Sequence, residues 1–251
     1  MLLEQKVCLV TGANRGIGAA IAKRFAEEGA IVYAASRSAV GATAPVDAAA
    51  LTVPPGTSGA IISLQLDVTD AAAMKDAFVR IKKEQGRLDV LVNNAGIMKD
   101  AIIGMISEQL LNETFATNVF AVINAMQLAA KLMQRQSSGS IINIASLVGT
   151  NGNKNQLVYA ASKGAVIAAT KAAAKELAAS GIRVNALAPG MIDTDLLANT
   201  DQTVVTELTK SIALGRIGKP SEVADACVWL ASGLSSYVTG QIIGVDGAAV
   251  M

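Results

Sequence analysis

The residues of this chain best suited to proton chemistry are Tyr159, Lys163 four positions later, and Ser146 thirteen positions before the tyrosine. A tyrosine and a lysine at this spacing lie one turn apart on the same face of a helix. The lysine charge favours the phenolate, so such a tyrosine exchanges a proton more readily near neutral pH. A serine hydroxyl brought to the same place would hold a substrate carbonyl oxygen. The spacing alone is weak, because a buried tyrosine beside a solvated lysine gives the same pattern.

A glycine-rich turn near the start of the chain indicates a nucleotide site. A short apolar run, Lys-Val-Cys-Leu-Val, predicts a buried strand. It leads into Thr-Gly-Ala-Asn-Arg-Gly-Ile-Gly at residues 11–18, and residues 19–28 have helical periodicity. In this context Gly12 permits a tight turn, Gly16 lets the backbone approach phosphates, and Gly18 lets helix pack on strand, while N–H groups of the helix start face the anion. A glycine turn that holds no nucleotide is the alternative.

The composition excludes several kinds of site. The 251 residues include no histidine, which rules out a Ser-His-Asp triad and a His-ligated metal site, and we expect no metal. Proton chemistry must therefore use Tyr, Lys, carboxylates, Cys or water. The two cysteines, Cys8 and Cys227, are far apart in apolar segments. This predicts small buried side chains in a reducing cytoplasm rather than a disulfide framework.

Charge and hydropathy bear on partners and location. The net charge is +1 and no basic block stands out, so nucleic acid is not an expected partner. We expect no membrane span, because no apolar run reaches the ~18 residues that a span needs. The N-terminus lacks the charge-then-apolar order of a signal peptide. These features together favour a cytoplasmic protein.

Short apolar runs alternate with longer amphipathic segments, which predicts repeated βα units and a parallel sheet in one domain spanning 1–251. Alanine and valine are abundant and aromatic residues make up only 3%, which suits a buried sheet covered closely by helices. Strands are predicted at residues 7–10, 31–35, 61–67, 90–93, 140–145, 183–188 and 242–245. Helices are predicted at residues 16–28, 71–85, 107–135, 159–179, 202–211 and 220–230.

Residues 38–59 differ from the rest of the chain because they are rich in Ala, Pro, Gly and Thr. We expect a short helix near 46–51 and a turn at 54–59. A linker between domains is the alternative interpretation. It is disfavoured because the next predicted strand follows at once and completes the same sheet.

Several motifs in order along the chain resemble the short-chain dehydrogenase/reductase family, and within it the 3-oxoacyl-acyl-carrier-protein reductases. They are the glycine turn at 11–18, Asp67-Val68, Asn93-Asn-Ala-Gly96, Asn118, Ser146, Tyr159 with Lys163, and Pro189-Gly190 followed by Thr194. The resemblance covers nearly the whole chain. It implies a Rossmann-type domain with a doubly wound, seven-stranded, mostly parallel sheet and helices on both faces.

The resemblance also implies the catalytic roles. Tyr159 would be the general acid in reduction, and Lys163 would bind the nicotinamide ribose and favour the phenolate. Ser146 would orient and polarise the carbonyl. Asn118 would lie in a helix and hold a water that links Lys163 to solvent. The positioned donors and the acid supply the rate, and the cofactor carries the hydride.

The cofactor is expected to be NADP(H), because the second predicted strand ends in Ala-Ser-Arg at 35–37 with no acid to bind ribose hydroxyls. Arg37 and Arg15 are suited to a 2′-phosphate, although either arginine is alternatively a solvated surface charge. The cofactor-binding residues implied by the family are Gly12, Asn14, Arg15, Gly16, Ile17, Gly18, Ser36, Arg37, Asp67, Val68, Asn93, Ala95, Gly96, Tyr159, Lys163, Pro189, Gly190, Ile192 and Thr194.

Two features concern the substrate. A lid is expected at about 193–214, and its apolar residues suit an acyl chain and ordinary helix packing equally well. In acyl-carrier-protein reductases, basic residues near the mouth of the active site attract the acidic carrier. The corresponding positions here are Ser137 and Ser180, neither of which is basic. Nearby basic residues are alternatives for that role: Lys131, Arg135, Lys175 and Arg183.

The function implied by the resemblance is NADPH-dependent reduction of a 3-oxoacyl thioester, with acyl carrier protein as the expected partner, to the (3R)-3-hydroxyacyl product in fatty-acid synthesis by a homotetramer. An acetoacetyl-CoA reductase is one alternative. An enzyme acting on a sugar, polyol, steroid or small ketone is another. A nucleotide-sensing protein without turnover belongs to a different class, and the intact Ser-Tyr-Lys set argues against it.

Overall fold

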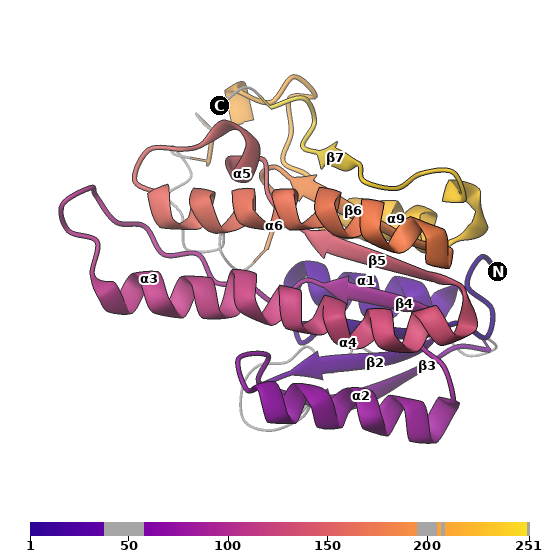
Figure 1. The fold of residues 1–251 in the computed structure, drawn as a ribbon. Helices are drawn as coiled ribbons and strands as arrows, with labels where there is room; N and C mark the ends of the chain where they lie inside the picture. Colours follow the sequence, from indigo (N-terminus) through magenta and orange to yellow (C-terminus); the bar gives the residue numbers. More distant parts are fainter. Residues whose placement is uncertain (38–57, 195–204, 207–208, 250–251) are drawn as a thin grey trace.

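A seven-stranded sheet forms the centre of the computed structural model, with helices on both of its faces (Figure 1). The structure describes residues 1–37, 58–194, 205–206 and 209–249. The strands are β1 (Val7–Thr11), β2 (Ile31–Ser36), β3 (Ala60–Gln65), β4 (Val90–Asn93), β5 (Gly139–Ile144), β6 (Ile182–Pro189) and β7 (Ile242–Val245). Their order is β3-β2-β1-β4-β5-β6-β7, and all neighbours are parallel. The order reverses direction between β1 and β4, the switch point at which such sheets bind ligands.

The strand sequences are apolar throughout because both faces of the sheet are covered. In β1, Val7 and Leu9 join the core on one face, whereas Cys8 and Val10 join the core on the other. All four side chains are at most 2% exposed. Successive side chains on a strand point to opposite faces, so a strand buried on both sides needs apolar residues at every position. This explains the uninterrupted apolar run that identified the strand.

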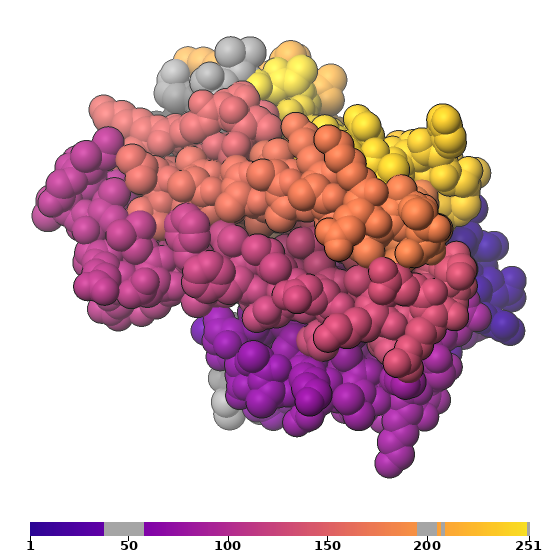
Figure 2. Space-filling model, in the orientation of Figure 1, coloured from indigo at the N-terminus to yellow at the C-terminus, as the bar shows by residue number. Residues whose placement is uncertain are grey.

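One face of the sheet is covered by α1 (Gly16–Glu27) and α9 (Pro220–Ala231), which are joined by a 2.8 Å ion pair between Arg24 and Asp225. The other face is covered by α2 (Ala71–Gln85), α4 (Ala121–Gln136) and α6 (Leu157–Leu177). The space-filling view of that face shows α4 and α6 lying against each other over the sheet (Figure 2). The shorter elements are α3 (Glu108–Phe115), η2 (Ala116–Phe120), α5 (Val148–Asn151), η3 (Ala178–Ser180) and η4 (Gly233–Ser235).

The helical run Glu108–Gln136 differs from expectation in two ways. It is not one uniform α-helix, because the π-helical turn η2 joins α3 to α4. It also has the length and apolar composition of a membrane span, with a mean hydropathy of 1.2. Its apolar side chains Val122, Met126 and Met133 nevertheless belong to the core between helix and sheet. The α4 part of the run therefore packs in the core against the sheet.

The predicted strands are all present, and the predicted helices at 16–28, 71–85 and 220–230 end within one residue of the observed ones. The fourth helix begins two residues earlier than expected, so Tyr159 lies inside its first turn. The short helix near 46–51 and most of the turn at 54–59 fall outside the described residues. So do half of the helix expected at 202–211 and the central part of the expected lid.

Candidate active site

The chemistry-bearing residues gather at one edge of the sheet because all seven strands run in the same direction. The glycine turn follows β1, Asn93 ends β4, Ser146 follows β5, and Pro189 ends β6. The carboxyl ends of parallel strands lie at a common edge, where open α/β sheets form their ligand crevice. Segments far apart in the sequence are therefore brought together by topology.

The centre of the site is formed by Tyr159, Lys163 and Ser146. The Ser146 side chain is close enough to the Tyr159 hydroxyl to lower its pKa through a hydrogen-bonding interaction. Lys163 is 5% exposed, its Nζ donates a 2.7 Å hydrogen bond to the carbonyl oxygen of Ile144, and the same atom lies 5.8 Å from the centroid of the Tyr159 ring. The Ser146 hydroxyl also accepts a 3.2 Å hydrogen bond from Val148 N. These contacts place the three predicted groups in one cluster.

The protonation of this cluster is governed by burial. Burial lowers the pKa of the Lys163 ammonium to about 8, because the charged form loses its hydration. Burial also raises the pKa of the Tyr159 hydroxyl, and the hydrogen bond with Ser146 only partly opposes this. The direction of the Tyr159 pKa shift is thus opposite to the lowering expected from a neighbouring lysine, because burial is its largest cause. A phenol that stays protonated at neutral pH is in the form that donates a proton.

Asn118 lies in the π-helical turn η2 and is completely buried. Its Oδ1 accepts a 2.9 Å hydrogen bond from Ile97 N, and its Nδ2 donates to the carbonyl oxygen of Ile97 at 2.9 Å and to Ser162 Oγ at 3.0 Å. The extra residue of a π turn re-aims a side chain, and such turns are frequent at functional sites. Here it holds the amide beside the segment that follows β4. The family resemblance singled out Asn118 and placed it in a helix, but did not predict the π turn.

Gly96 connects Asn118 to the lysine. A Cβ atom at Gly96 would lie 3.4 Å from Asn118 Oδ1 and 3.5 Å from Lys163 Nζ. The carboxamide and the ammonium therefore face the same small space, which a longer side chain at this position would fill. This agrees with the expectation that a small residue is needed here.

The glycine turn has the expected geometry. Gly12 and Gly16 have φ angles of +66° and +53°, which side chains disfavour. A Cβ at Gly18 would overlap the carbonyl oxygen of Gly12, so the third glycine sets the closeness of α1 to the turn. Arg15 is the N-cap of α1 in an extended conformation, and the first turn of α1 contains no acidic residue. The N–H groups there keep the positive end of the helix dipole available to an anion.

The Asn93 side chain at the end of β4 points into the protein interior. The Asn93 side chain is 3% exposed and donates a 2.8 Å hydrogen bond to Asn143 Oδ1, and Asn143 in turn donates to Thr170 Oγ1 at 2.9 Å. Its side chain is thus part of a buried network between the sheet and α6. Contact between Asn93 and the cofactor stays a prediction that concerns its backbone, because alternation along β4 turns the side chain into the core.

Asn94 and Thr11, which were not among the predicted site residues, hold the glycine turn against the end of β4 by hydrogen bonds. Asn94 Nδ2 donates to the carbonyl oxygens of Thr11 at 2.9 Å and Gly12 at 3.0 Å. Thr11 Oγ1 accepts hydrogen bonds from the backbone N–H groups of Asn94 and Ala95 at 3.0 and 3.1 Å. The pair of asparagines at the end of β4 indicated a polar contact with the glycine turn. The sequence does not say which of the two side chains makes it.

The segment after β6 approaches the glycine turn. A Cβ at Gly16 would lie 3.3 Å from Thr194 Cγ2, so these two predicted residues lie side by side. Gly190 N donates to the carbonyl oxygen of Val245 at 3.1 Å, which ties the segment to β7. The Ile192 side chain is 7% exposed and packs in the core shared by α1 and α9. Only the backbone of Ile192 is therefore suited to polar contact with a ligand.

At the end of β2, Ser36 is buried and Arg37 is exposed. The Asp67 carboxylate accepts hydrogen bonds from Thr69 Oγ1 at 2.7 Å and Thr69 N at 2.9 Å. These bonds, with a smaller contribution from the Arg37 charge, hold the Asp67 pKa below its usual value. The Asp67 carboxylate thus closes an Asx turn with Thr69. Val68 and Ala95 line one small cavity with Thr11.

The remaining predicted residues of the glycine turn lie along it. Asn14 and Ile17 are half-buried, whereas Arg15 is exposed. Pro189 is buried at the end of β6, next to the backbone of β7. All of the predicted residues are therefore at the same edge of the sheet, except that the Asn93 and Ile192 side chains face the interior.

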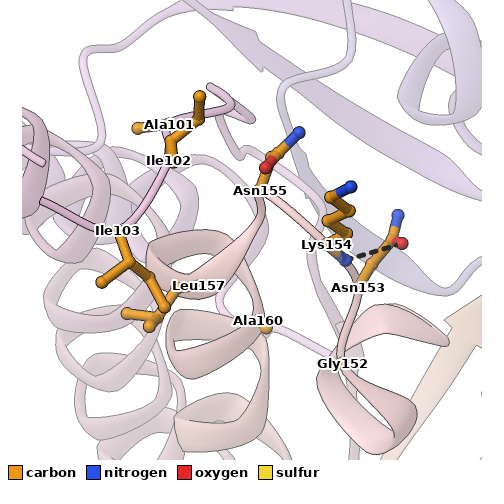
Figure 3. A pocket seen from close by; sticks show the side chains of 9 residues that line it. All are labelled: Ala101, Ile102, Ile103, Gly152, Asn153, Lys154, Asn155, Leu157 and Ala160. Atoms are coloured by element: carbon orange, nitrogen blue, oxygen red, sulfur yellow. Dashed lines mark hydrogen bonds between the residues drawn. The ribbon is translucent and has the colours of Figure 1, made fainter. Parts of the chain in front are cut away.

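A depression of about 450 Å³ lies beside the first turn of α6 (Figure 3). Its apolar wall comes from Ile102, Ile103 and Leu157, which are 60%, 75% and 46% exposed. Ile103 and Leu157 lie close together in the close-up, while the side chains of Lys154 and Asn155 point elsewhere. The other lining residues are Ala101, Gly152, Asn153 and Ala160.

The two positions corresponding to carrier-binding residues, Ser137 and Ser180, are not at the mouth of this site. They precede β5 and β6, whereas the site residues follow those strands. A parallel sheet separates the starts and ends of its strands, so the two serines lie at the opposite edge of this chain. They do come together, because a Cβ at Gly181 would overlap the carbonyl oxygen of Ser137.

Arg183 does not supply a substitute charge. Its Nη2 donates to the carbonyl oxygens of Leu230 at 2.7 Å and Ser232 at 3.2 Å, and its Nη1 donates to Ser235 Oγ at 2.9 Å. The guanidinium thus caps the end of α9. Lys131, Arg135 and Lys175 are exposed near the two serines.

The residues at the site edge fit a nicotinamide dinucleotide. The start of α1 offers N–H groups without a competing acid, and Gly96 keeps open the space in front of Lys163 and Asn118. A parallel sheet with this glycine turn and a Ser-Tyr-Lys cluster at the same edge defines a nicotinamide-dependent oxidoreductase that interconverts carbonyl and hydroxyl groups. Residues 12–248 match the family model described as enoyl-(acyl carrier protein) reductase. The chain belongs to the short-chain dehydrogenase/reductase family.

Curated relatives cover the chain from end to end. It is 44% identical over 251 residues to the 3-oxoacyl-acyl-carrier-protein reductase of Thermotoga maritima, which covers 100% of both chains. It is 39% identical to the enzyme of the same name from Chlamydia trachomatis, over 98% of both chains. It is also 41% identical to a 3alpha-hydroxysteroid dehydrogenase of Mediterraneibacter gnavus, over 99% of this chain and 98% of that protein.

Proposed function

We propose that this protein is an NADPH-dependent reductase of 3-oxoacyl thioesters, acting on 3-oxoacyl-acyl carrier protein to give the (3R)-3-hydroxyacyl product in fatty-acid synthesis. The observation that carries the proposal is the cluster in which the buried Lys163 Nζ lies 5.8 Å from the Tyr159 ring centroid and the Ser146 side chain interacts with the Tyr159 hydroxyl. This arrangement suits a carbonyl that must be held and protonated. The reductase names of full-length relatives support the choice of a thioester substrate.

Each side chain of the cluster has a distinct task in this proposal. A bound dihydronicotinamide supplies the hydride to the carbonyl carbon. Ser146 donates a hydrogen bond to the carbonyl oxygen, and Tyr159 gives it the proton that completes the alcohol. Lys163 holds a positive charge near the phenol below pH ~8, which eases the loss of that proton. Asn118 keeps the segment after β4 in place and carries the route for proton resupply.

The preference for NADP(H) over NAD(H) rests on the end of β2. Ala35-Ser36-Arg37 offers no carboxylate for ribose hydroxyls, and the exposed Arg37 is suited to a 2′-phosphate. Arg15 at the start of α1 is a second cation on the same side of the glycine turn. Two guanidinium groups favour a phosphate because they bind it through paired hydrogen bonds.

We further place the protein in the cytoplasm, as a single domain over residues 1–251 that assembles into a homotetramer. The exposed apolar side chains on the run from α3 to α4 support an assembly face. Leu111, Phe120 and Ile123 are 39%, 57% and 38% exposed there. Side chains of this kind are more favourable when a partner covers them.

A second candidate is supported by a specific observation. The Mediterraneibacter gnavus relative is a steroid dehydrogenase with nearly the same identity as the reductases. Reduction of a steroid ketone, or of the CoA ester acetoacetyl-CoA, needs the same catalytic cluster. The residues that differ between such enzymes would be those contacting the substrate. Because Ser137 and Ser180 carry no positive charge, this chain lacks the basic pair that would recognise an acidic carrier.

The deciding experiment follows NADPH oxidation with acetoacetyl-acyl carrier protein, acetoacetyl-CoA and a 3-oxosteroid at equal low concentrations. Preference for the carrier-bound substrate would support the proposal. Equal or better use of the CoA ester would replace it with an acetoacetyl-CoA reductase. Activity with the steroid alone would establish the second candidate, and no NADPH consumption with any ketone would exclude a reductase.

A further inference from the structure

The first turn of α6 carries the proposed acid but lacks a capping side chain. Gln156 is the N-cap residue, no side-chain hydrogen bond caps the helix, and Tyr159 is its third residue. The N–H groups of a first turn have no intrahelical partners, so a helix without a cap loosens there first. A proton donor needs the opposite property, because small displacements of catalytic groups reduce the rate strongly. Another contact must hold this turn.

The side chain of Gln156 makes that contact by joining two loops to the helix. It is 9% exposed, unusually buried for an amide at a helix end. Its Nε2 donates a 3.0 Å hydrogen bond to Asp100 Oδ1, and its Oε1 accepts a 3.1 Å hydrogen bond from Asn153 Nδ2. Its backbone carbonyl accepts a 2.7 Å hydrogen bond from Ala160 N, across the turn that contains Tyr159.

A second link runs parallel to the first. Ala101 N donates a 2.8 Å hydrogen bond to the carbonyl oxygen of Asn155. Asn155 has a φ angle of +65°, a left-handed conformation that a residue other than glycine adopts at a cost. The segment after β4 and the segment before α6 are therefore joined at two consecutive positions. Both segments also form the wall of the depression beside α6.

We infer that Gln156 is a positioning residue for Tyr159, which acts by fastening the first turn of α6 to Asp100 in the segment after β4. The inference rests on the proposed function, since it concerns the geometry of the proposed proton donor. The direction of the hydrogen bond is fixed, because a carboxylate only accepts and the amide must donate. Exchanging the donor and the acceptor between positions 156 and 100 therefore tests the inference.

Three variants make the exchange. Gln156→Glu places two carboxylates against each other, and we expect kcat to fall by about tenfold or more with a smaller change in KM, because the turn is pushed out of position. Asp100→Asn keeps an acceptor and should change kcat little. The double variant Asp100→Asn with Gln156→Glu restores a donor facing an acceptor, and should recover most of the lost kcat in a double-mutant cycle.

The matched control is Gln109→Glu. Gln109 Nε2 donates a 2.7 Å hydrogen bond to Glu113 Oε1 on the surface of α3, so the same chemical change is made away from Tyr159. We expect this variant to keep the parent kcat. Asp100→Ala provides a further test at an exposed position if Gln156→Glu does not fold. It should lower kcat while the midpoint of thermal unfolding stays close to that of the parent.

Amide hydrogen exchange at residues 157–160 gives a readout that does not depend on turnover. We expect faster exchange in Gln156→Glu than in the parent, and parent-like exchange in the double variant. Unchanged exchange and kcat in Gln156→Glu, or a double variant no better than Gln156→Glu, would overturn the inference. A parent that oxidises no NADPH would refute the proposed function instead, and the exchange data would still decide whether Gln156 holds the turn.

Discussion

Lys163 Nζ donates a 2.7 Å hydrogen bond to the carbonyl oxygen of Ile144, the last residue of β5. Ser146 follows two residues later, so this contact ties the helix that carries Tyr159 to the end of the strand that precedes the serine. The lysine is buried without a carboxylate among the causes that shift its pKa, and burial is the dominant one. Its charge is therefore held next to the phenol by the fold, at a cost in hydration.

Tyr159→Phe should abolish turnover while leaving the fold and cofactor affinity almost intact. The substitution removes the hydroxyl that donates the proton, and loss of a general acid typically costs about 10²–10⁴ in rate. The measurements are kcat for NADPH oxidation and the NADPH dissociation constant by fluorescence titration.

The control is Tyr237→Phe, since Tyr237 is fully exposed away from the cluster. It should match the parent in both measurements. Substantial activity in Tyr159→Phe would remove this residue from the role of acid.

The stability of the protein should rise with pH between about 8 and 10.5 because of Lys163. Its pKa is about 8 in the folded chain and 10.5 in the reference state, so in this window the unfolded chain binds more protons. Lys163→Met removes the titrating group. The difference in unfolding free energy between the parent and the variant should therefore increase in favour of the parent, by on the order of 1–3 kcal/mol from the bottom to the top of this pH window.

Urea unfolding at pH 7, 8, 9 and 10 measures this difference. Lys171→Met is the control, because that lysine is exposed on the same helix, and its curve should run parallel to that of the parent. A constant gap between the parent and Lys163→Met at all four pH values would contradict the assignment of a lowered pKa.

Arg37→Asp should shift cofactor preference from NADPH toward NADH. The change replaces a cation suited to a 2′-phosphate with an acid suited to ribose hydroxyls. The measurement is the ratio of kcat/KM values for NADPH and NADH, which we expect to fall by at least about tenfold. Arg135→Asp, at the end of α4, reproduces the charge change at the opposite edge and should leave the ratio unaltered. An unaltered ratio in Arg37→Asp would refute the role of this arginine.

Gly18→Ala should damage both stability and cofactor binding. The added Cβ would overlap the carbonyl oxygen of Gly12, so α1 must move away from the glycine turn. Overpacking of this kind typically costs about 1–3 kcal/mol. The measurements are the thermal unfolding midpoint and NADPH affinity.

Gly233→Ala is the control, because a Cβ there meets nothing within 4 Å. It should have nearly the same midpoint as the parent. Equal behaviour of the two variants would show that close packing at Gly18 is not needed.

The sequence by itself determined the order of strands and helices along the chain and singled out the residues of the proposed catalytic cluster. Strands buried on both faces need continuous apolar runs, and glycine turns need residues that accept positive φ angles, so both leave a local signal. The spacing of Tyr159 and Lys163 is likewise a local property, because one helical turn brings them together.

Only the tertiary structure decided how the neighbouring groups are oriented. Asn93 turns into the core and Asn94 toward the glycine turn, which depends on hydrogen bonds to Asn143 and Thr11 from distant segments. The raised pKa of Tyr159 depends on the burial of its hydroxyl in the folded chain. Ser137 lies away from the site because strand direction separates the two edges of the sheet. These properties arise from contacts between segments remote in sequence, so no local pattern specifies them.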